Sequence, residues 1–130
     1  MHMLKLIRSI MYVVVISACA LPALAQTLKC QIYERDQWHT VDSPVLTSAY
    51  IAYAHDYKHF RFKPVVVSQD GALSYVKIHV YYQTRNQPVL MHMTMYTAPF
   101  VFGPTLTGVQ TVYSPDKGRP FTYDCHLAQE

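Results

Sequence analysis

Hydrophobic and polar residues alternate in short runs, separated by Gly and Pro, along most of the chain after residue 26. Val, Ile, Thr, Tyr and Phe dominate these runs, and all five are enriched in strands. The run 75–83 is the clearest and places one set of side chains on a single face: Val76, Ile78, Val80 and Tyr82. In the run 89–97 one face carries Val89, Met91, Met93 and Met95, and the other carries Leu90, His92, Thr94 and Tyr96. The alternation predicts an all-β fold.

Turn residues set the expected strand register. Residues 84–88 read as a turn, and pairing Thr84 with Val89 would bring Met91, Met93 and Met95 opposite Tyr82, Val80 and Ile78 on the core face. Upstream, Gln69-Asp70-Gly71 predicts a three-residue loop with Gly71 in the left-handed conformation. A two-residue Asp70-Gly71 turn is disfavoured, because it would place Arg61 and Lys63 on the core face.

The two ends of the domain are expected to meet. A last hairpin should run from about residue 106 to 127, and Cys30 and Cys125 are the cysteines that remain once an export leader is removed. In an oxidising compartment this pair predicts one disulfide, which joins the first strand to the last. The resulting fold is a small antiparallel barrel or sandwich of about six to eight strands. Residues 42–58 are expected to be a strand, and a short helix is the alternative, because Val45, Ala49 and Tyr53 also keep helical spacing.

Residues 1–25 have the pattern of a cleaved signal peptide. Lys5 and Arg8 precede an apolar run, and Ala23-Leu24-Ala25 supplies a small-x-small cleavage site. Cleavage is expected to separate a leader, 1–25, from a single all-β domain, 26–130. This domain is expected in the periplasm or outside the cell. The alternative is an outer-membrane lipoprotein, because Ile16-Ser17-Ala18-Cys19 resembles a lipoprotein box in which Cys19 is lipidated.

Length, charge and motifs exclude several classes of function. A chain of 130 residues fits one domain and is too short for a Rossmann enzyme with a partner domain. The net charge of +3 falls to +1 without the two leader cations, so nothing indicates a nucleic-acid partner. None of the motifs G-x-S-x-G, H-E-x-x-H and the P-loop occurs. We therefore expect a non-enzymatic protein without a cofactor.

Two features favour a protein-binding surface. The face opposite the predicted core is rich in Tyr and His and comprises Tyr75, Lys77, His79, Tyr81, His92, Thr94 and Tyr96. Tyr gives large contact area at low entropic cost, which suits interfaces. The apolar segment 99–104 adds Phe100 and Phe102, which would either enter a partner's groove or plug the end of their own barrel. The residues expected to bind a partner are Lys77, His79, Tyr81, His92, Tyr96, Phe100 and Phe102.

The leading hypothesis is an exported, non-catalytic module of the inhibitor or immunity type, which docks on another envelope or secreted protein. The alternative is a periplasmic copper or zinc protein. Its ligands would be His79 and His92, expected as diagonal neighbours on one face, with the possible addition of Met91, Met93 and Met95.

Overall fold

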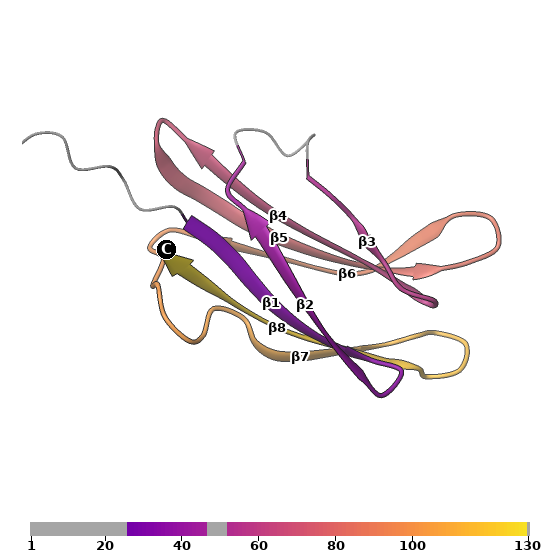
Figure 1. Cartoon of the computed structure of the whole chain (residues 1–130). Helices are drawn as coiled ribbons and strands as arrows, with labels where there is room; N and C mark the ends of the chain where they lie inside the picture. Colours follow the sequence, from indigo (N-terminus) through magenta and orange to yellow (C-terminus); the bar gives the residue numbers. More distant parts are fainter. Residues whose placement is uncertain (1–25, 47–51, 130) are drawn as a thin grey trace, which may run out of the picture.

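The structure is a computed structural model that describes residues 26–46 and 52–129. It is all-β, with eight strands: β1 Gln26–Glu34, β2 Gln37–Pro44, β3 His55–Asp56, β4 Phe60–Gln69, β5 Ala72–Gln83, β6 Pro88–Thr97, β7 Gly108–Tyr113 and β8 Pro120–Gln129. They form two antiparallel four-stranded sheets, β2-β1-β8-β7 and β3-β4-β5-β6, which face each other as a sandwich (Figure 1). The expected fold class is confirmed. The predicted signal peptide, with Cys19, lies outside the described residues.

In the described part of residues 42–58 the structure has strand at both ends and no helix, so the helical alternative is not found there. Strand β2 ends at Pro44, and Leu46 then makes an isolated parallel bridge to Val67 of β4. Residues 47–51 lie outside the described ranges, so the helical spacing of Val45, Ala49 and Tyr53 is only partly covered. Neither described range contains a helix long and apolar enough to cross a membrane.

The predicted disulfide is confirmed and lies at the centre of the first sheet. Strand β1 pairs with β2 on one side and with β8 on the other, and Cys30 is directly opposite Cys125. Both cysteines are fully buried and bonded to each other. Thr107 lies next to the disulfide, and its Oγ1 accepts a hydrogen bond of 3.0 Å from the Cys125 amide. The first and last strands of the domain are thus neighbours with a covalent link.

The core lies between the sheets and follows the alternation read from the sequence. Sheet one contributes mainly Leu28, Cys30, Ile32, Phe121, Tyr123, Cys125 and Leu127, and sheet two contributes Phe60, Phe62, Val66, Val76, Ile78 and Val80. Phe121 joins the two sets, because its ring lies 5.1 Å from the Phe60 ring and 5.8 Å from the Phe62 ring, centroid to centroid. Rings at such distances add attraction beyond their buried area.

The β4–β5 hairpin has the expected faces but a different turn. Gln69 pairs with Ala72, so the loop is the two-residue Asp70-Gly71 turn that the sequence disfavoured. Both turn residues have positive φ, 54° and 78°, as a type I′ turn requires. Beyond Val67 the pairing shifts by one residue, which leaves Ser74 as an extra residue in β5. This extra residue cancels the change of face that the shorter turn would cause. Phe60 and Phe62 are therefore buried, and Arg61 and Lys63 are not.

The predicted register of the β5–β6 hairpin is wrong in two ways. Val89 pairs with Tyr82 and not with Thr84, a shift of two residues that leaves the faces unchanged, and a second bulge then reverses them. Close to the turn Tyr82 pairs with Val89, but further on Val80 pairs with His92, so Met91 is an extra residue in β6. One extra residue reverses every later side chain. Met93 and Met95 therefore point away from the core and are half exposed, whereas Met91 stays partly buried against it.

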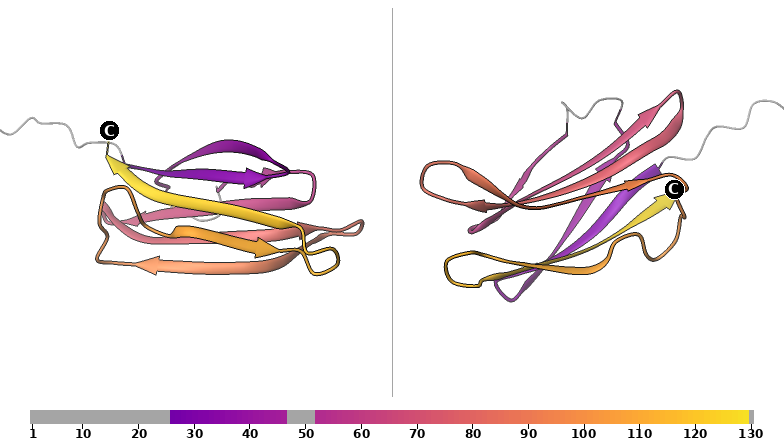
Figure 2. Two further views of the ribbon diagram at one scale, coloured as in Figure 1. Left: turned by 90° about the horizontal axis from the view of Figure 1, so that it is seen from below. Right: turned by 180° about the vertical axis from the view of Figure 1, so that it is seen from behind.

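Each sheet has two end strands, and the end strands β6 and β7 lie on the same side of the sandwich. Seen from below, β6 and β7 run together along the side opposite β2 (Figure 2). On the side of β2, the sheets are joined by the bridge between Leu46 and Val67. Strands β6 and β7 end their sheets, and no strand of the described residues pairs with their outer edges.

Candidate functional site

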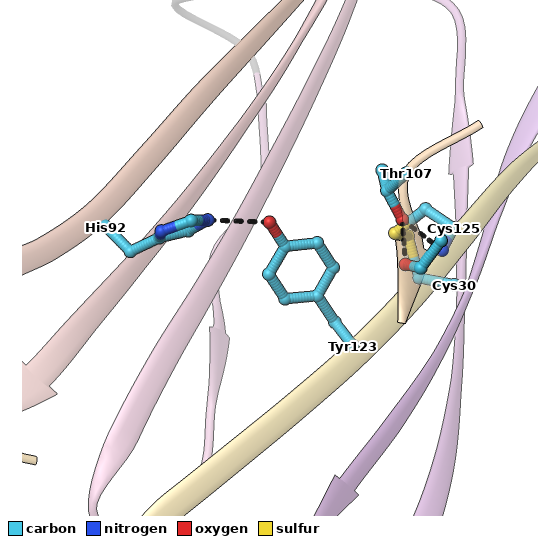
Figure 3. Close-up of a disulfide and its surroundings, with 6 residues drawn as sticks. Cys30, His92, Thr107, Tyr123 and Cys125 are labelled. Atoms are coloured by element: carbon cyan, nitrogen blue, oxygen red, sulfur yellow. Dashed lines mark hydrogen bonds between the residues drawn. A yellow bond between two sulfur atoms is a disulfide. The ribbon is translucent and has the colours of Figure 1, made fainter. Parts of the chain in front are cut away.

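The expected Tyr/His face is divided between the two sides of the second sheet. His79 pairs with Met93 on the outer side, while His92 pairs with buried Val80 on the inner side. The imidazole of His92 reaches across the sandwich, and its Nε2 is hydrogen-bonded to the hydroxyl of buried Tyr123 at 2.7 Å (Figure 3). The expectation that His79 and His92 share one face, and could share a metal, is wrong. No group of three or more His, Cys, Asp or Glu within the described ranges could hold an ion.

Tyr96 and the Phe-rich segment also turn inward. Tyr96 lies on the inner side of β6 and packs partly buried against the core. Phe100 and Phe102 pack against the core too, and only Val101 between them is exposed, by 72%. The amide of Gly103 donates to the carbonyl of Leu127 and so holds this segment against β8. Phe100 and Phe102 thus pack against the protein's own core, as in the alternative in which this segment plugs the end of its own barrel.

The outer side of β5 and β6 combines the remaining predicted residues with three that were assigned to the core or not considered. We define the β5–β6 outer face as Tyr75, Lys77, His79, Tyr81, Leu90, Met93 and Met95. Leu90, Met93 and Met95 are 49%, 50% and 51% exposed. Burial lowers the pKa of His79, and its Nδ1–H donates to the Lys63 carbonyl, so His79 is a neutral member of this face. Its ring stacks beside that of Tyr81.

This face is continuous in sequence with a long stretch free of charge. Between Arg85 and Asp116, thirty consecutive residues contain no Asp, Glu, Lys or Arg. They form β6, β7 and the segment between them, which together make one side of the sandwich (Figure 2). Of the nine large hydrophobic side chains exposed in the described residues, this stretch supplies seven: Val89, Leu90, Met93, Met95, Val101, Val109 and Tyr113. We call residues 86–115 the uncharged side.

A second cluster, which was not expected from the sequence, lies at the end of the sandwich where β1 ends and β4 and β8 begin. Glu34 is only 5% exposed, and its Oε1 lies 3.2 Å from His39 Nε2. Nearby, Arg119 Nη1 donates to His59 Nε2 at 2.7 Å. One signal was present in the sequence: Glu34 continues the buried series Leu28, Cys30, Ile32 at the two-residue spacing of a strand.

The charges in this cluster influence one another. The pKa of His59 is lowered, first by burial and then by the positive charge of Arg119, so His59 is neutral and accepts the Arg119 hydrogen bond. The pKa of Tyr57 is raised by burial and by the Glu34 carboxylate. The ring of Tyr57 lies against those of His39 and Phe121. A buried carboxylate paired with a histidine can orient a proton acceptor, and the described side chains that line this cluster include no Ser, Thr, Cys or Lys.

Comparisons with protein-family models, with curated proteins and with solved structures found no match.

Proposed function

We propose that the protein is exported and acts as a non-catalytic binding module that docks on another envelope or secreted protein through the uncharged side and the adjoining β5–β6 outer face. Inhibitor and immunity proteins are the class that this size and architecture favour. The observation that carries the proposal is the collection of seven exposed large hydrophobic side chains on thirty residues without a charge. Depletion of charge and enrichment of Met, Tyr and Phe are typical of the central part of protein interfaces.

The open edge of β6 supports the same proposal. Soluble proteins usually protect an edge strand with Lys, Pro, a bulge or a covering segment, because unpaired backbone groups attract other strands. Strand β6 is ten residues long, has no Lys, Arg, Asp or Glu, and has Pro88 only at its first position. Its bulge at Met91 turns more hydrophobic surface outward. An extended, uncharged segment of a partner protein fits this edge by strand addition, with Leu90, Met93 and Met95 beside it.

Export is supported by the signal-like sequence of residues 1–25 and by the buried disulfide, which suits an oxidising compartment. A metal-binding function has no comparable support, because His79 and His92 lie on opposite sides of their sheet.

The test is capture from envelope extract with the tagged, disulfide-bonded protein and two charge variants. Met93→Lys with Met95→Lys adds two charges to the β5–β6 outer face, where the side chains already meet water. The matched control is Thr40→Lys, at an exposed position of β2 on the opposite edge. We expect one stoichiometric partner that wild type and Thr40→Lys retain and that the Met93/Met95 variant loses.

Three results would contradict the proposal. One is that the wild-type protein captures nothing. Another is that only further copies of this chain are recovered. The third is that the Met93/Met95 variant captures the partner as well as wild type does, which would place the interface elsewhere. A Tyr81→Ala variant adds a second probe of the same face, because Tyr81 is on its outer side and only half-buried.

A further inference from the structure

The methionines of the sandwich are all in β6 and differ in their exposure. After residue 25 the sequence contains three of them: Met91, Met93 and Met95. The bulge at Met91 turns the other two to the outer side, where Met93 is 50% exposed and Met95 is 51% exposed. Met91 itself is partly buried against the core. Three chemically identical side chains on one strand thus meet the solvent to different degrees.

The two exposed thioethers have no thiol that competes with them for an oxidant. In the part of the chain that the structure describes, both cysteines are fully buried and bonded to each other. Strand β6 ends its sheet, so among the described strands only β5 pairs with it. Exposed thioether sulfur is then the group that a peroxide oxidises most readily.

Oxidation by hydrogen peroxide changes a thioether from an apolar group into a polar one. The O–O bond of the peroxide breaks as an S–O bond forms, and the sulfur loses an electron pair. The proton of the transferred oxygen leaves with the other oxygen as water. The sulfoxide oxygen is a good hydrogen-bond acceptor, whereas thioether sulfur is a weak one. The oxidised side chain therefore needs a hydrogen-bond donor wherever water is excluded.

The side chains directly opposite do not supply this donor. Met93 pairs with His79, which is neutral and donates its ring N–H to a backbone carbonyl of β4. Met95 pairs with Lys77, whose Nζ lies 5.4 Å from the centroid of the Tyr75 ring. In the free protein water can hydrate both sulfoxides. In a docked complex that water is displaced, and polar oxygens would remain in the apolar part of the interface.

We propose that Met93 and Met95 are an oxidation site, at which peroxide forms two sulfoxides and thereby releases the partner from the β5–β6 outer face. The release rests on the proposed docking function. The fold is retained, because the oxidised side chains remain in water and Met91, which packs against the core, reacts more slowly. Oxidation here thus weakens binding and leaves the stability unchanged.

Nuclear magnetic resonance with ¹³C-labelled methionine methyl groups tests the oxidation site without any partner. Single Met→Leu variants assign the signals of the three methionines in the disulfide-bonded protein. With hydrogen peroxide we expect Met93 and Met95 to be converted several times faster than Met91, with an unchanged midpoint of urea denaturation. In urea, where the chain is unfolded, all three should react at one rate. Equal rates in the folded protein, or a lower urea midpoint once Met93 and Met95 are oxidised, overturns the proposal.

Capture from envelope extract tests the release of the partner. The tagged protein is treated until Met93 and Met95 have reacted, the peroxide is removed, and capture is compared with that of the untreated sample. We expect oxidation to lower capture of the partner by at least about tenfold, because the sulfoxide oxygens lack donors in the interface. Capture that oxidation leaves unchanged overturns the proposal.

Two variants assign the effect to the exposed thioethers, and each is compared only with its own untreated sample. Met93→Leu with Met95→Leu removes both exposed sulfurs at nearly constant volume, so peroxide should not change its capture. Met91→Leu keeps both sulfurs, so peroxide should lower its capture as in wild type. A loss on oxidation of the Leu double variant overturns the proposal. An untreated wild type that captures no partner overturns the proposed function and the release with it, while the resonance experiment still decides the oxidation site.

Discussion

The largest single contribution to stability that can be calculated from the structure is the link between β1 and β8. Replacing Cys30 and Cys125 together by Ala removes a cross-link whose ends are 95 residues apart. In the chain-entropy description, a loop of this length stabilises the folded state by about 4.7 kcal/mol, because it restricts the unfolded chain. Both sulfurs are fully buried, so their loss also removes contacts from the core. We expect the free energy of unfolding to fall by about 3–5 kcal/mol.

Urea denaturation of the oxidised wild type and the double variant measures this loss and separates its causes. An unfolded chain without the cross-link is more extended, so the denaturant slope m should rise in the double variant. Leu127→Ala is the control for packing, since Leu127 is fully buried and directly opposite Leu28 in the same strand pair. It should cost about 2–5 kcal/mol at an unchanged m. A loss below about 1 kcal/mol for the double variant, or an m identical to that of Leu127→Ala, would refute the cross-link argument.

Three further predictions follow from individual contacts. In a double-mutant cycle by urea denaturation, Tyr123→Phe and His92→Leu should couple by about 1 kcal/mol, and zero coupling would contradict the inward position of His92. Burial lowers the pKa values of His59 and His79 in the folded state, so the unfolded chain takes up these protons at a higher pH than the folded chain does, and stability should decline as the pH falls from about 7 to about 5. His59→Gln with His79→Gln should flatten that decline in a pH series of urea melts, and an unchanged slope would be evidence against it. Gly71→Ala should cost about 1–2 kcal/mol because φ there is 78°, whereas Gly103→Ala, at an ordinary φ with open space around it, should be nearly neutral in the same assay.

The hydrophobic alternation was sufficient to predict the fold class but not every register. The inward faces of β1, β5 and β8, and of β4 up to Pro64, follow from period two, and the disulfide follows from two cysteines near the ends. The bulges at Ser74 and Met91 have no signature in the alternation, yet each reverses the face of everything beyond it. In the β4–β5 hairpin the bulge compensates for the shorter turn, so the predicted faces were correct although the strand partners differ by two residues. In the β5–β6 hairpin nothing compensates, and Met93 and Met95 exchange places with His92 and Thr94.

The candidate sites were predictable only in part, because bulges and side-chain packing decide which residues meet at the surface. Tyr75, Lys77, His79 and Tyr81 are on the outer side as expected, because the extra residue of the second bulge lies in β6 and leaves the alternation of β5 over these positions unchanged. The cluster around Glu34 joins residues more than eighty positions apart, and its contacts arise from side-chain packing that no local pattern encodes. Sequence reasoning could have noted that Glu34 occupies a core position of its strand, which is uncommon for an acid.

The pairing of β1 with β8 also has a consequence for the order of assembly. Strands β4, β5 and β6 form consecutive hairpins, so most of the second sheet can pair as soon as residue 97 is free to fold. The first sheet is different, because β1 has a local neighbour only in β2 and must wait for residues 120–129 before its other side is filled. Contacts that span such a long stretch of chain form slowly. When the chain emerges from its amino end, the second sheet can therefore be paired while the first sheet is still incomplete, and the bond between Cys30 and Cys125 belongs to the last step of folding.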